Sequence, residues 1–388
     1  MTDQNPSTPW FRALVQFPSV RVIAALAVGL LMACDDSSQS DYASPGPYTV
    51  GVTTLSMGDR DLEVFYPAED GSEEGVEAAF YDLVDPLGPD LRDLILVSYP
   101  EVNARIDLPA YRDLPSSLDG PFPVMILSHG SGGFRLAYSK LLAGIASYGF
   151  VVASIDHLEW GLASTLGFGP PAEAARDAAE LVLATLDLLD AESADPMSVL
   201  AGSSDTNFVA TAGHSAGGQA AFAFPTDDVP EVKTLIGYAT VPFDVVPEKP
   251  VLLLLGAEDF AVTTERTLLS YDALTVKKRY VAVTDAGHNS FTDQCEIIFN
   301  GNDIIAAAQL IFGPVFPDSL AALARDGCVE GNLPPWEFWQ VTQHYTVAHL
   351  KDVFGLNSGH PSLYDQQPWL FPDIEVDYRF AGATPDSR

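Results

Sequence analysis

The chain has 388 residues, enough to bury a large core. Hydrophobic residues make up 47% of it and aromatic residues 10%, which excludes an extensively disordered protein. Its 19 basic and 53 acidic residues give a formal net charge of −34, which repels nucleic-acid phosphates and anionic membrane surfaces. We therefore expect one main folded domain and no nucleic-acid partner; the oligomeric state is left open.

Residues 1–33 are predicted to be an export signal. Arg12 and Arg21 precede the uncharged run from Val22 to Met32, which is too short to span a bilayer comfortably. The run ends in Leu-Met-Ala-Cys, which resembles a bacterial lipoprotein signal that is cut before the cysteine. The resemblance implies a lipid on Cys34 and a membrane-anchored lipoprotein, so that any membrane contact is made through this anchor. An ordinary signal peptide, giving a periplasmic or extracellular protein, and a buried apolar helix are the alternatives.

The main domain is expected over residues 48–315. Residues 34–47 are polar and include Pro and Gly, which favours a flexible tether. Alternating residues over 48–54 and 61–66 predict two early strands. The stretch at about 80–118 has no sustained period, so we interpret it as an insertion with a short helix or two and an unknown role.

From Pro123 onward, runs typical of strands alternate with helical patterns. Strands are predicted over 124–128, 150–155, 208–212, 232–238, 251–255 and 279–283. Helices are predicted over 138–147, 172–189, 219–224, 304–310 and, more weakly, 336–353. Because the strand runs are apolar on both faces, we predict an α/β fold with a doubly wound, mainly parallel sheet between helices. Residues 316–388 are expected to pack on this domain as a C-terminal extension, with 361–372 extended along its surface.

The segment GHSAGG, residues 213–218, lies between a predicted strand and a predicted helix. A serine on so sharp a turn needs small neighbours, because larger side chains would collide with the strand and the helix. The N-terminus of the helix also favours developing negative charge. We therefore predict that Ser215 is a nucleophile; a purely structural turn is the alternative.

An oxyanion hole needs two backbone N–H donors. Ala216 follows the nucleophile and supplies the first. The loop SHGSGG, residues 128–133, follows an apolar run, and its glycines allow a ligand to approach the backbone closely. We choose Ser131 as the second donor and assign His129 to support of the loop, the alternative being a loop that merely turns.

An acid is expected at the end of a later strand, and the base after it. The run VLLLLG is followed by Glu258 and Asp259; we prefer Asp259 and keep Glu258 as the alternative. His288 follows the predicted strand at 279–283. Three later histidines follow no predicted strand and are weaker candidates for the base: His344, His349 and His360. The order Ser215, Asp259, His288 is that of the α/β hydrolases.

Two cysteines remain if Cys34 is lipidated. In an exported chain, Cys295 and Cys328 are predicted to form a disulfide, with two buried thiols as the alternative. Neither cysteine has a paired Cys or His at metal-ligand spacing, so we expect no metal site there.

Several of these segments together carry a family resemblance. FPVMILSHGSGGFRLAYSKLLAGIASYGFVVASIDH, GHSAGG, GAED and AGHNSFTD resemble the platelet-activating-factor acetylhydrolase and dienelactone-hydrolase-like branch of the α/β hydrolases, which is close to bacterial polyester hydrolases. The similarity covers roughly Tyr48 to Phe312. It implies the α/β-hydrolase fold, a serine esterase of the lipase class, no cofactor, and the roles given above for the nucleophile, its partners and the oxyanion donors. Dienelactone hydrolases carry a cysteine at the elbow, so Ser215 argues against that reaction.

These observations predict a serine carboxylic ester hydrolase that acts through an acyl-enzyme on short-acyl or lipid-like esters. A phospholipid acetylhydrolase and a polyester hydrolase are alternatives within this class. An inactive, surface-anchored binding protein is the alternative from another class. Four aromatic residues in loops near the strand ends are expected to line the substrate pocket or to lie in the core: Phe134, Trp160, Phe260 and Phe291.

Overall fold

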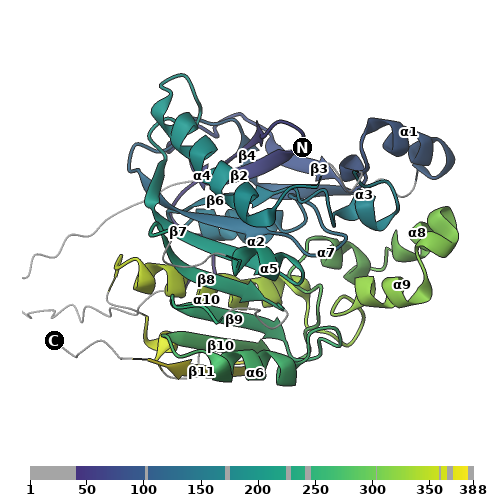
Figure 1. The fold of residues 1–388 in the computed structure, drawn as a ribbon. Coiled ribbons are helices and arrows are strands. Elements are labelled where there is room, and N and C mark those ends of the chain that lie inside the picture. Colours follow the sequence, from purple (N-terminus) through teal and green to yellow (C-terminus); the bar gives the residue numbers. More distant parts are fainter. Residues whose placement is uncertain are drawn as a thin grey trace, which may run out of the picture. The chain divides into compact units, whose positions relative to one another are not determined.

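The computed structural model describes residues 41–100, 104–170, 175–223, 229–240, 246–302, 304–357, 360–364 and 370–382. Cys34 and the expected export signal lie outside these residues. The described part of the chain forms one 11-stranded sheet with helices on both faces (Figure 1). The predicted α/β-hydrolase fold, with its doubly wound and mainly parallel sheet, is confirmed.

The strands run in the order β11-β10-β9-β8-β7-β5-β6-β2-β1-β4-β3 across the sheet. Their bounds are β1 Val50–Ser56, β2 Asp61–Pro67, β3 Ala78–Asp82, β4 Arg105–Arg112, β5 Phe122–Ser128, β6 Val151–Ile155, β7 Ser204–His214, β8 Val232–Tyr238, β9 Val251–Gly256, β10 Lys278–Val283 and β11 Val376–Ala381. Strands β5 to β10 pair in parallel, whereas β2 pairs antiparallel with both β1 and β6. All carboxyl ends of the parallel strands therefore meet at one edge of the sheet.

Helices connect the strands and cover the sheet. The α-helices are α1 Pro89–Ser98, α2 Ser139–Ala146, α3 Leu162–Thr165, α4 Ala178–Ala194, α5 Gly217–Ala221, α6 Thr264–Ala273, α7 Gln294–Phe299, α8 Ile304–Phe312, α9 Asp318–Arg325 and α10 Pro335–Val353. Short 3-10 helices are η1 Asp85–Leu87, η4 Gly313–Val315 and η5 Pro361–Leu363. Helices α2 and α10 pack on each other, while α4 and α5 pack against β7 from the opposite face (Figure 1).

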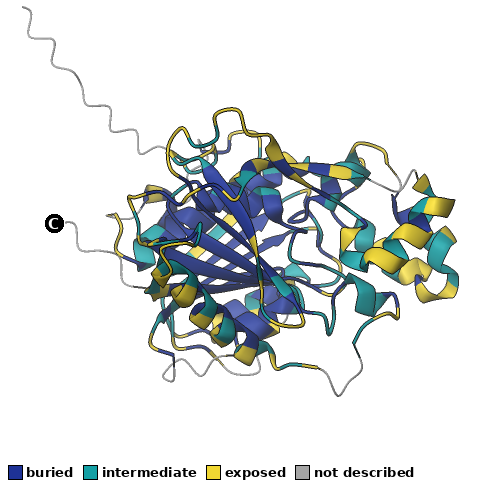
Figure 2. Ribbon diagram, turned by 90° about the horizontal axis from the view of Figure 1, so that it is seen from above, coloured by how far each residue is buried: buried dark blue, intermediate teal, exposed yellow. Residues whose placement is uncertain are grey.

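The central strands are buried on both faces, as their sequence predicts. Every residue of β5 and of β9 is buried, and one continuous apolar core includes side chains from both faces of the sheet (Figure 2). Burial of a whole apolar side chain stabilises a fold by about 1.5–3 kcal/mol. These strands are therefore a rigid support for the loops at their carboxyl ends.

The described residues of the expected insertion at 80–118 contain more regular structure than the sequence indicates. The expected helix is present as α1, but β3 and β4 on either side of it extend the sheet beyond β1. In β4 the buried residues alternate with exposed ones, which is the pattern of a strand with one solvent face. The missed signal was this alternation at Ile106, Leu108 and Ala110, which Pro109 interrupts.

The C-terminal extension is an integral part of the domain. Strand β11 pairs antiparallel with β10 at the edge of the sheet, and 13 residues of α10 are buried. The described residues on either side of the expected boundary near residue 315 therefore belong to one compact unit. The described residues of the extension contact the sheet through α10 and add β11 to its edge.

The end of the expected tether is bound to the domain. The backbone N–H of Tyr42 donates to His344 Nδ1 at 3.0 Å, and Gln343 Nε2 donates to the carbonyl oxygens of Tyr42 and Ser44 at 2.7 and 2.8 Å. The ring of Tyr42 also packs edge-on against Tyr148. The prediction of a flexible tether is therefore wrong for residues 41–47, because the polar groups of α10 fix this segment.

A disulfide joins Cys295 in α7 to Cys328 beyond α9, as predicted. The 33-residue separation encloses α8 and α9, so both helices are held at their base. In the described part of the chain, no helix is long and apolar enough to cross a membrane.

Removal of the disulfide is expected to destabilise the domain. The chain-entropy estimate for a loop of this length is about 4 kcal/mol. Cys328→Ser and the double variant Cys295→Ser/Cys328→Ser should therefore lower the free energy of unfolding by similar amounts in urea titrations, relative to the oxidised protein. An unfolding midpoint that stays at the wild-type value in both variants would show that the bridge does not stabilise the fold.

Candidate active site

Ser215 lies at the carboxyl end of β7, on the turn into α5. Its φ of 52° is in the left-handed region, which costs a non-glycine residue about 1–3 kcal/mol. Glycine makes the turn possible, because a Cβ at Gly217 would collide with the carbonyl of Ser128, and a Cβ at Gly213 with the carbonyl of Gly217. The Ser215 N–H donates to the Tyr238 carbonyl at 3.0 Å, which fixes the turn to β8. The expected sharp elbow is therefore present.

The predicted acid and base lie beside Ser215. Ser215 Oγ is 2.9 Å from His288 Nε2, and His288 Nδ1 is 2.7 Å from Asp259 Oδ2. Because a carboxylate only accepts, His288 Nδ1 carries a proton and Nε2 can accept the serine proton. Asp259 Oδ1 in turn accepts from the backbone N–H groups of Ala261 and Val262, which fixes the carboxylate.

The competing candidates lie elsewhere. Glu258 is exposed, whereas Asp259 is 3% exposed. The three later histidines are buried and hydrogen-bonded away from Ser215: His344 and His360 share Ser362, and His349 contacts Thr234 and Arg279. Among the predicted acids and bases, only Asp259 and His288 therefore form a row with Ser215.

The two predicted oxyanion donors lie near Ser215: Ala216 follows it in the chain, and Ser131 lines the same pocket. The N–H groups of Ser131 and Ala216 donate to no other residue in the described part of the chain. Gly130 brings the two loops together, because a Cβ there would lie 3.1 Å from Ser215 Cβ. The pair is therefore a candidate oxyanion hole.

The first loop, residues 128–133, is held from behind. Gly132 N–H donates to the Trp160 carbonyl at 2.8 Å, and Trp160 Nε1 donates to the His129 carbonyl at 3.0 Å. His129 bonds Gly130 O and the N–H of His157, and burial lowers its pKa, so its ring is a neutral part of the scaffold. These contacts match the loop-supporting position expected for His129.

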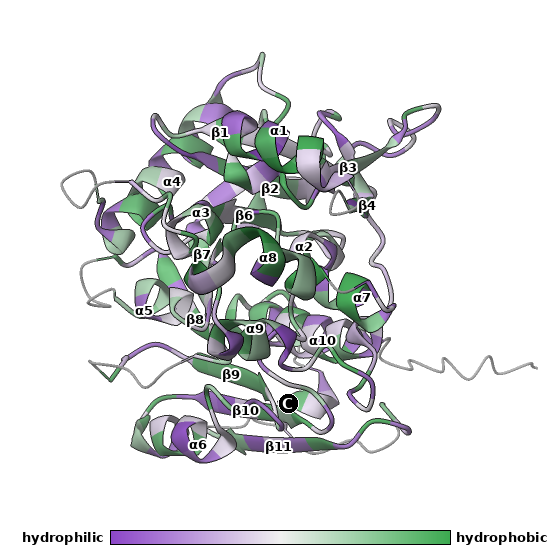
Figure 3. Ribbon diagram, turned by 90° about the vertical axis from the view of Figure 1, so that its right-hand side faces the viewer, coloured by the Kyte–Doolittle hydropathy of each residue, from purple (hydrophilic) through white to green (hydrophobic). Residues whose placement is uncertain are grey.

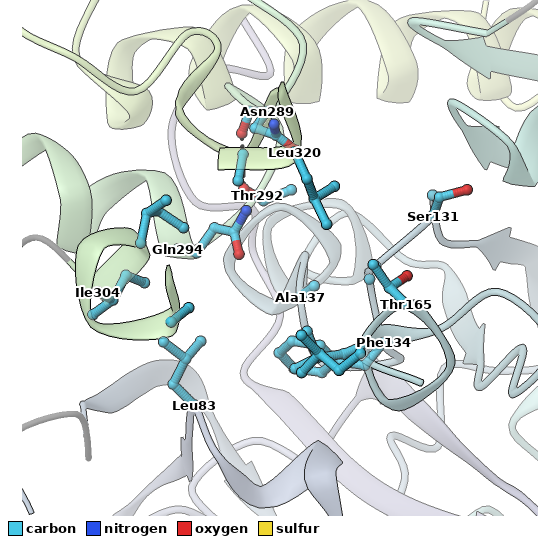
Figure 4. Close-up of a pocket in the computed structure, with 18 of the residues that line it drawn as sticks. Leu83, Ser131, Phe134, Ala137, Thr165, Asn289, Thr292, Gln294, Ile304 and Leu320 are labelled. Atoms are coloured by element: carbon cyan, nitrogen blue, oxygen red, sulfur yellow. Dashed lines mark hydrogen bonds between the residues drawn. The ribbon is translucent and has the colours of Figure 1, made fainter. Parts of the chain in front are cut away.

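An apolar pocket of about 180 Å³ opens above Ser215 and His288 (Figure 4). Its walls come from three parts of the chain that project from the carboxyl edge of the sheet: the segment around η1 and α1, helix α3, and the pair α8 and α9. The apolar wall residues are Leu83, Val84, Leu87, Ile95, Leu162, Leu166, Ile304, Ile305, Ala308, Ile311, Phe312, Phe316, Leu320, Leu323 and Ala324. Figure 3 faces this end of the molecule and shows that α8 is largely hydrophobic.

One of the four expected pocket aromatics lines this cavity. Phe134 does, and Figure 4 shows it on the same side as Ser131. Trp160 instead stacks on His157, with ring centroids 4.2 Å apart. Phe260 is 57% exposed beside the acid, and Phe291 is fully buried in the core, so neither forms the wall. Sequence reasoning missed the walls from α1, α8 and α9, although it predicted the apolar helix at 304–310 without assigning it a role.

This sheet, elbow and Ser-His-Asp row define an α/β hydrolase in fold and site geometry. Comparisons with known proteins show what part of the chain is similar to. The model of the family "Platelet-activating factor acetylhydrolase, isoform II" matches residues 36–192, which include the loop at 128–133 but end before Ser215. The resemblance to the platelet-activating-factor acetylhydrolase branch is thereby confirmed.

Curated proteins and a solved structure are also similar to the chain, the solved structure in its fold. Platelet-activating factor acetylhydrolase of Cavia porcellus is 33% identical over 141 residues, which are 33% of this chain and 31% of the relative. The Gallus gallus protein of that name is 25% identical over 40% of each chain. The matches thus span about a third of the length of these relatives. A ferulic acid esterase from Streptomyces cinnamoneus shares the fold, with a TM-score of 0.55, 20% identity, and coverage of 86% of this chain and 98% of that one.

A buried carboxyl group fixes the loop that follows His288. Asp293 Oδ2 accepts from Tyr81 Oη at 3.2 Å, and Oδ1 accepts from the Lys140 N–H at 3.2 Å. Burial raises the pKa of Asp293 to about 8, although the nearby Lys140 charge and these hydrogen bonds oppose the shift. The carboxyl group is therefore neutral in the folded protein at pH 7 and ionised in the unfolded chain.

Asp293 should make the fold less stable as the pH rises. Because its pKa is higher in the folded than in the unfolded chain, its contribution is fully present below about pH 4 and is lost as the pH rises through about 8. Asp293→Asn should abolish this loss, so its free energy of unfolding should fall less between pH 5 and 9 than that of the wild type in urea titrations. Asp187→Asn, at an exposed carboxylate of α4, should follow the wild-type curve. Parallel curves for wild type and Asp293→Asn would contradict the assignment.

Proposed function

We propose that the protein is a serine carboxylic ester hydrolase acting on lipid-like esters. The row of Ser215, His288 and Asp259, with two free backbone N–H groups beside it and an apolar pocket above it, is the observation that carries this proposal. The similarity to proteins named platelet-activating factor acetylhydrolase supports it.

The geometry suits acyl transfer to the serine. Ser215 Oγ attacks the ester carbonyl while His288 Nε2 takes its proton; Asp259 holds the imidazole in the required tautomer and stabilises its cationic form. The N–H groups of Ser131 and Ala216 then bind the oxyanion. His288 returns the proton to the departing alcohol, and water, activated by the same imidazole, releases the acyl group. The elbow thus supplies both the nucleophile and one of the oxyanion donors.

The pocket favours an apolar substrate. An engineered cavity of about 150 Å³ in another protein binds benzene, so the 180 Å³ here holds a group far larger than acetyl. Its mostly apolar wall offers few partners to a charged acyl chain. A lipid-like ester therefore fits better than a short-acyl one, while phospholipid acetyl esters and polyesters remain the alternatives to be assayed beside it.

The protein is proposed to be exported. The predicted signal at residues 1–33 supports this, and so does the disulfide between Cys295 and Cys328, since disulfides persist mainly in oxidising compartments. Lipidation of Cys34 is part of the same proposal.

Substitution of the nucleophile tests the activity. Ser215→Ala should lower kcat for p-nitrophenyl esters by about 10⁴-fold or more, as nucleophile removal does in other triads. Ser203→Ala, at the amino end of β7, makes the same chemical change and should leave kcat unchanged. Circular dichroism would check the fold of both variants. Near-wild-type turnover by folded Ser215→Ala would refute the proposed function.

Filling the pocket should change the preference for chain length. Ala308→Trp places a large ring in the wall, and each apolar methylene that loses its contacts costs about 0.8 kcal/mol. The ratio of kcat/KM for p-nitrophenyl octanoate to that for the acetate should therefore fall at least about tenfold. Leu310→Trp lies on the same helix with its side chain exposed and should keep the wild-type ratio. A panel from C2 to C16, with a phospholipid and a polyester film, completes the assay; an unchanged ratio in Ala308→Trp would show that the acyl chain binds elsewhere.

A further inference from the structure

A chain of buried hydrogen bonds links the base to the oxyanion loop. His214 Nε2 is 2.9 Å from the carbonyl oxygen of His288, and His214 Nδ1 is 2.8 Å from Tyr138 Oη. Tyr138 Oη also accepts from the Gly130 N–H at 3.3 Å. Tyr138 is 1% exposed and His214 is 2% exposed, so water does not compete for these contacts.

The chemistry of the groups fixes the direction of each bond. A carbonyl oxygen only accepts, so His214 Nε2 must carry a proton and donate to His288. Burial, with a further contribution from the neighbouring His288, lowers the pKa of His214 well below its ordinary value, so its ring is neutral and Nδ1 accepts. Tyr138 therefore donates to Nδ1 and accepts from Gly130. All these groups are satisfied in one arrangement, and reversal of either side-chain donor would leave two acceptors facing each other.

The two ends of this chain lie on the two functional parts of the site. One end holds the backbone of His288, whose ring accepts the proton of Ser215. The other holds Gly130, which precedes the proposed donor Ser131. The rings of His214 and His288 are tilted against each other, with centroids 4.8 Å apart. The ring of Phe291 also packs against that of His214, with centroids 5.2 Å apart. Phe291, which the sequence places either in the pocket or in the core, is therefore a core residue that packs against His214.

We propose that Tyr138 and His214 are positioning residues that set the distance between the base and the oxyanion hole. The proposal rests on the proposed esterase function. Both residues also border the pocket. Each acts on the site through a neighbour, Tyr138 through Gly130 and His214 through the His288 backbone. A loss of either bond should therefore weaken binding of the transition state and leave binding of the ester ground state intact.

The test uses single and double substitutions in the full-length protein. Tyr138→Phe removes only the hydroxyl and should lower kcat about tenfold at unchanged KM. His214→Phe removes both bonds and should lower kcat about 100-fold, while His214→Gln, whose amide can still donate toward His288, should recover part of the loss. Because both residues belong to the same series of hydrogen bonds, the kcat of the double variant Tyr138→Phe/His214→Phe should be no lower than that of His214→Phe alone. Tyr66→Phe is the control: it removes a buried hydroxyl in β2 that donates to the Leu114 carbonyl oxygen, and it should keep the wild-type kcat.

A tetrahedral analogue separates positioning from loss of stability. The dissociation constant of 1,1,1-trifluoro-2-octanone, which adds to the serine and places an oxyanion in the hole, should rise by the same factor as kcat falls in each variant. Urea titration would give the stability of each protein. If folded Tyr138→Phe keeps the wild-type kcat and analogue affinity, or if the two substitutions act additively, the positioning role is wrong. Retained activity in Ser215→Ala would instead overturn the proposed function itself.

Discussion

The site depends on one strained turn. Ser215 adopts a left-handed backbone conformation between a buried strand and a short helix, and it can do so only because glycines at 213, 217 and 218 leave room for the adjacent backbones and for Thr240. The cost of that conformation is offset by the packing of β7 between β5 and β8 and by the bond from its N–H to Tyr238. Because the strand is rigid, the serine oxygen and the Ala216 N–H keep a fixed relation to the loops that follow β5, β9 and β10.

Around this turn the site has two parts, one at the rigid strand ends and one in the helices that project beyond them. The strand ends carry the proposed nucleophile, acid, base and oxyanion donors, and hydrogen bonds hold the elbow and the loop at 128–133 in place. The walls of the pocket come instead from α1, α3, α8 and α9, which form two small apolar clusters of their own beyond the main core. The disulfide closes the base of the α8 and α9 pair. The pocket wall is therefore packed partly apart from the strand ends that carry Ser215.

The sequence predicted the rigid part well and the walls poorly, for physical reasons. Buried parallel strands are apolar on both faces, and a serine elbow needs small residues, so β5 to β10 and the row of Ser215, Asp259 and His288 are readable locally. Strand β11 is an edge strand with mixed polarity, and only its pairing with β10, more than 90 residues earlier, defines it. The pocket wall is likewise a product of distant packing: nothing local shows that Val84 and Ile311 face the same cavity. The series of hydrogen bonds through Tyr138 and His214 joins parts of the sequence that are far apart, so only the three-dimensional structure reveals it.

The attachment of residues 41–48 also sets a direction for the whole molecule. Tyr42 packs against Tyr148, which precedes β6, and Tyr48 packs against Phe122, which begins β5. Ser215 instead lies where β7 ends, beside the pocket. The chain therefore enters the domain at the end opposite to its pocket. The segment before Asp41, with the lipid proposed on Cys34, is therefore joined to the domain at the end away from the pocket.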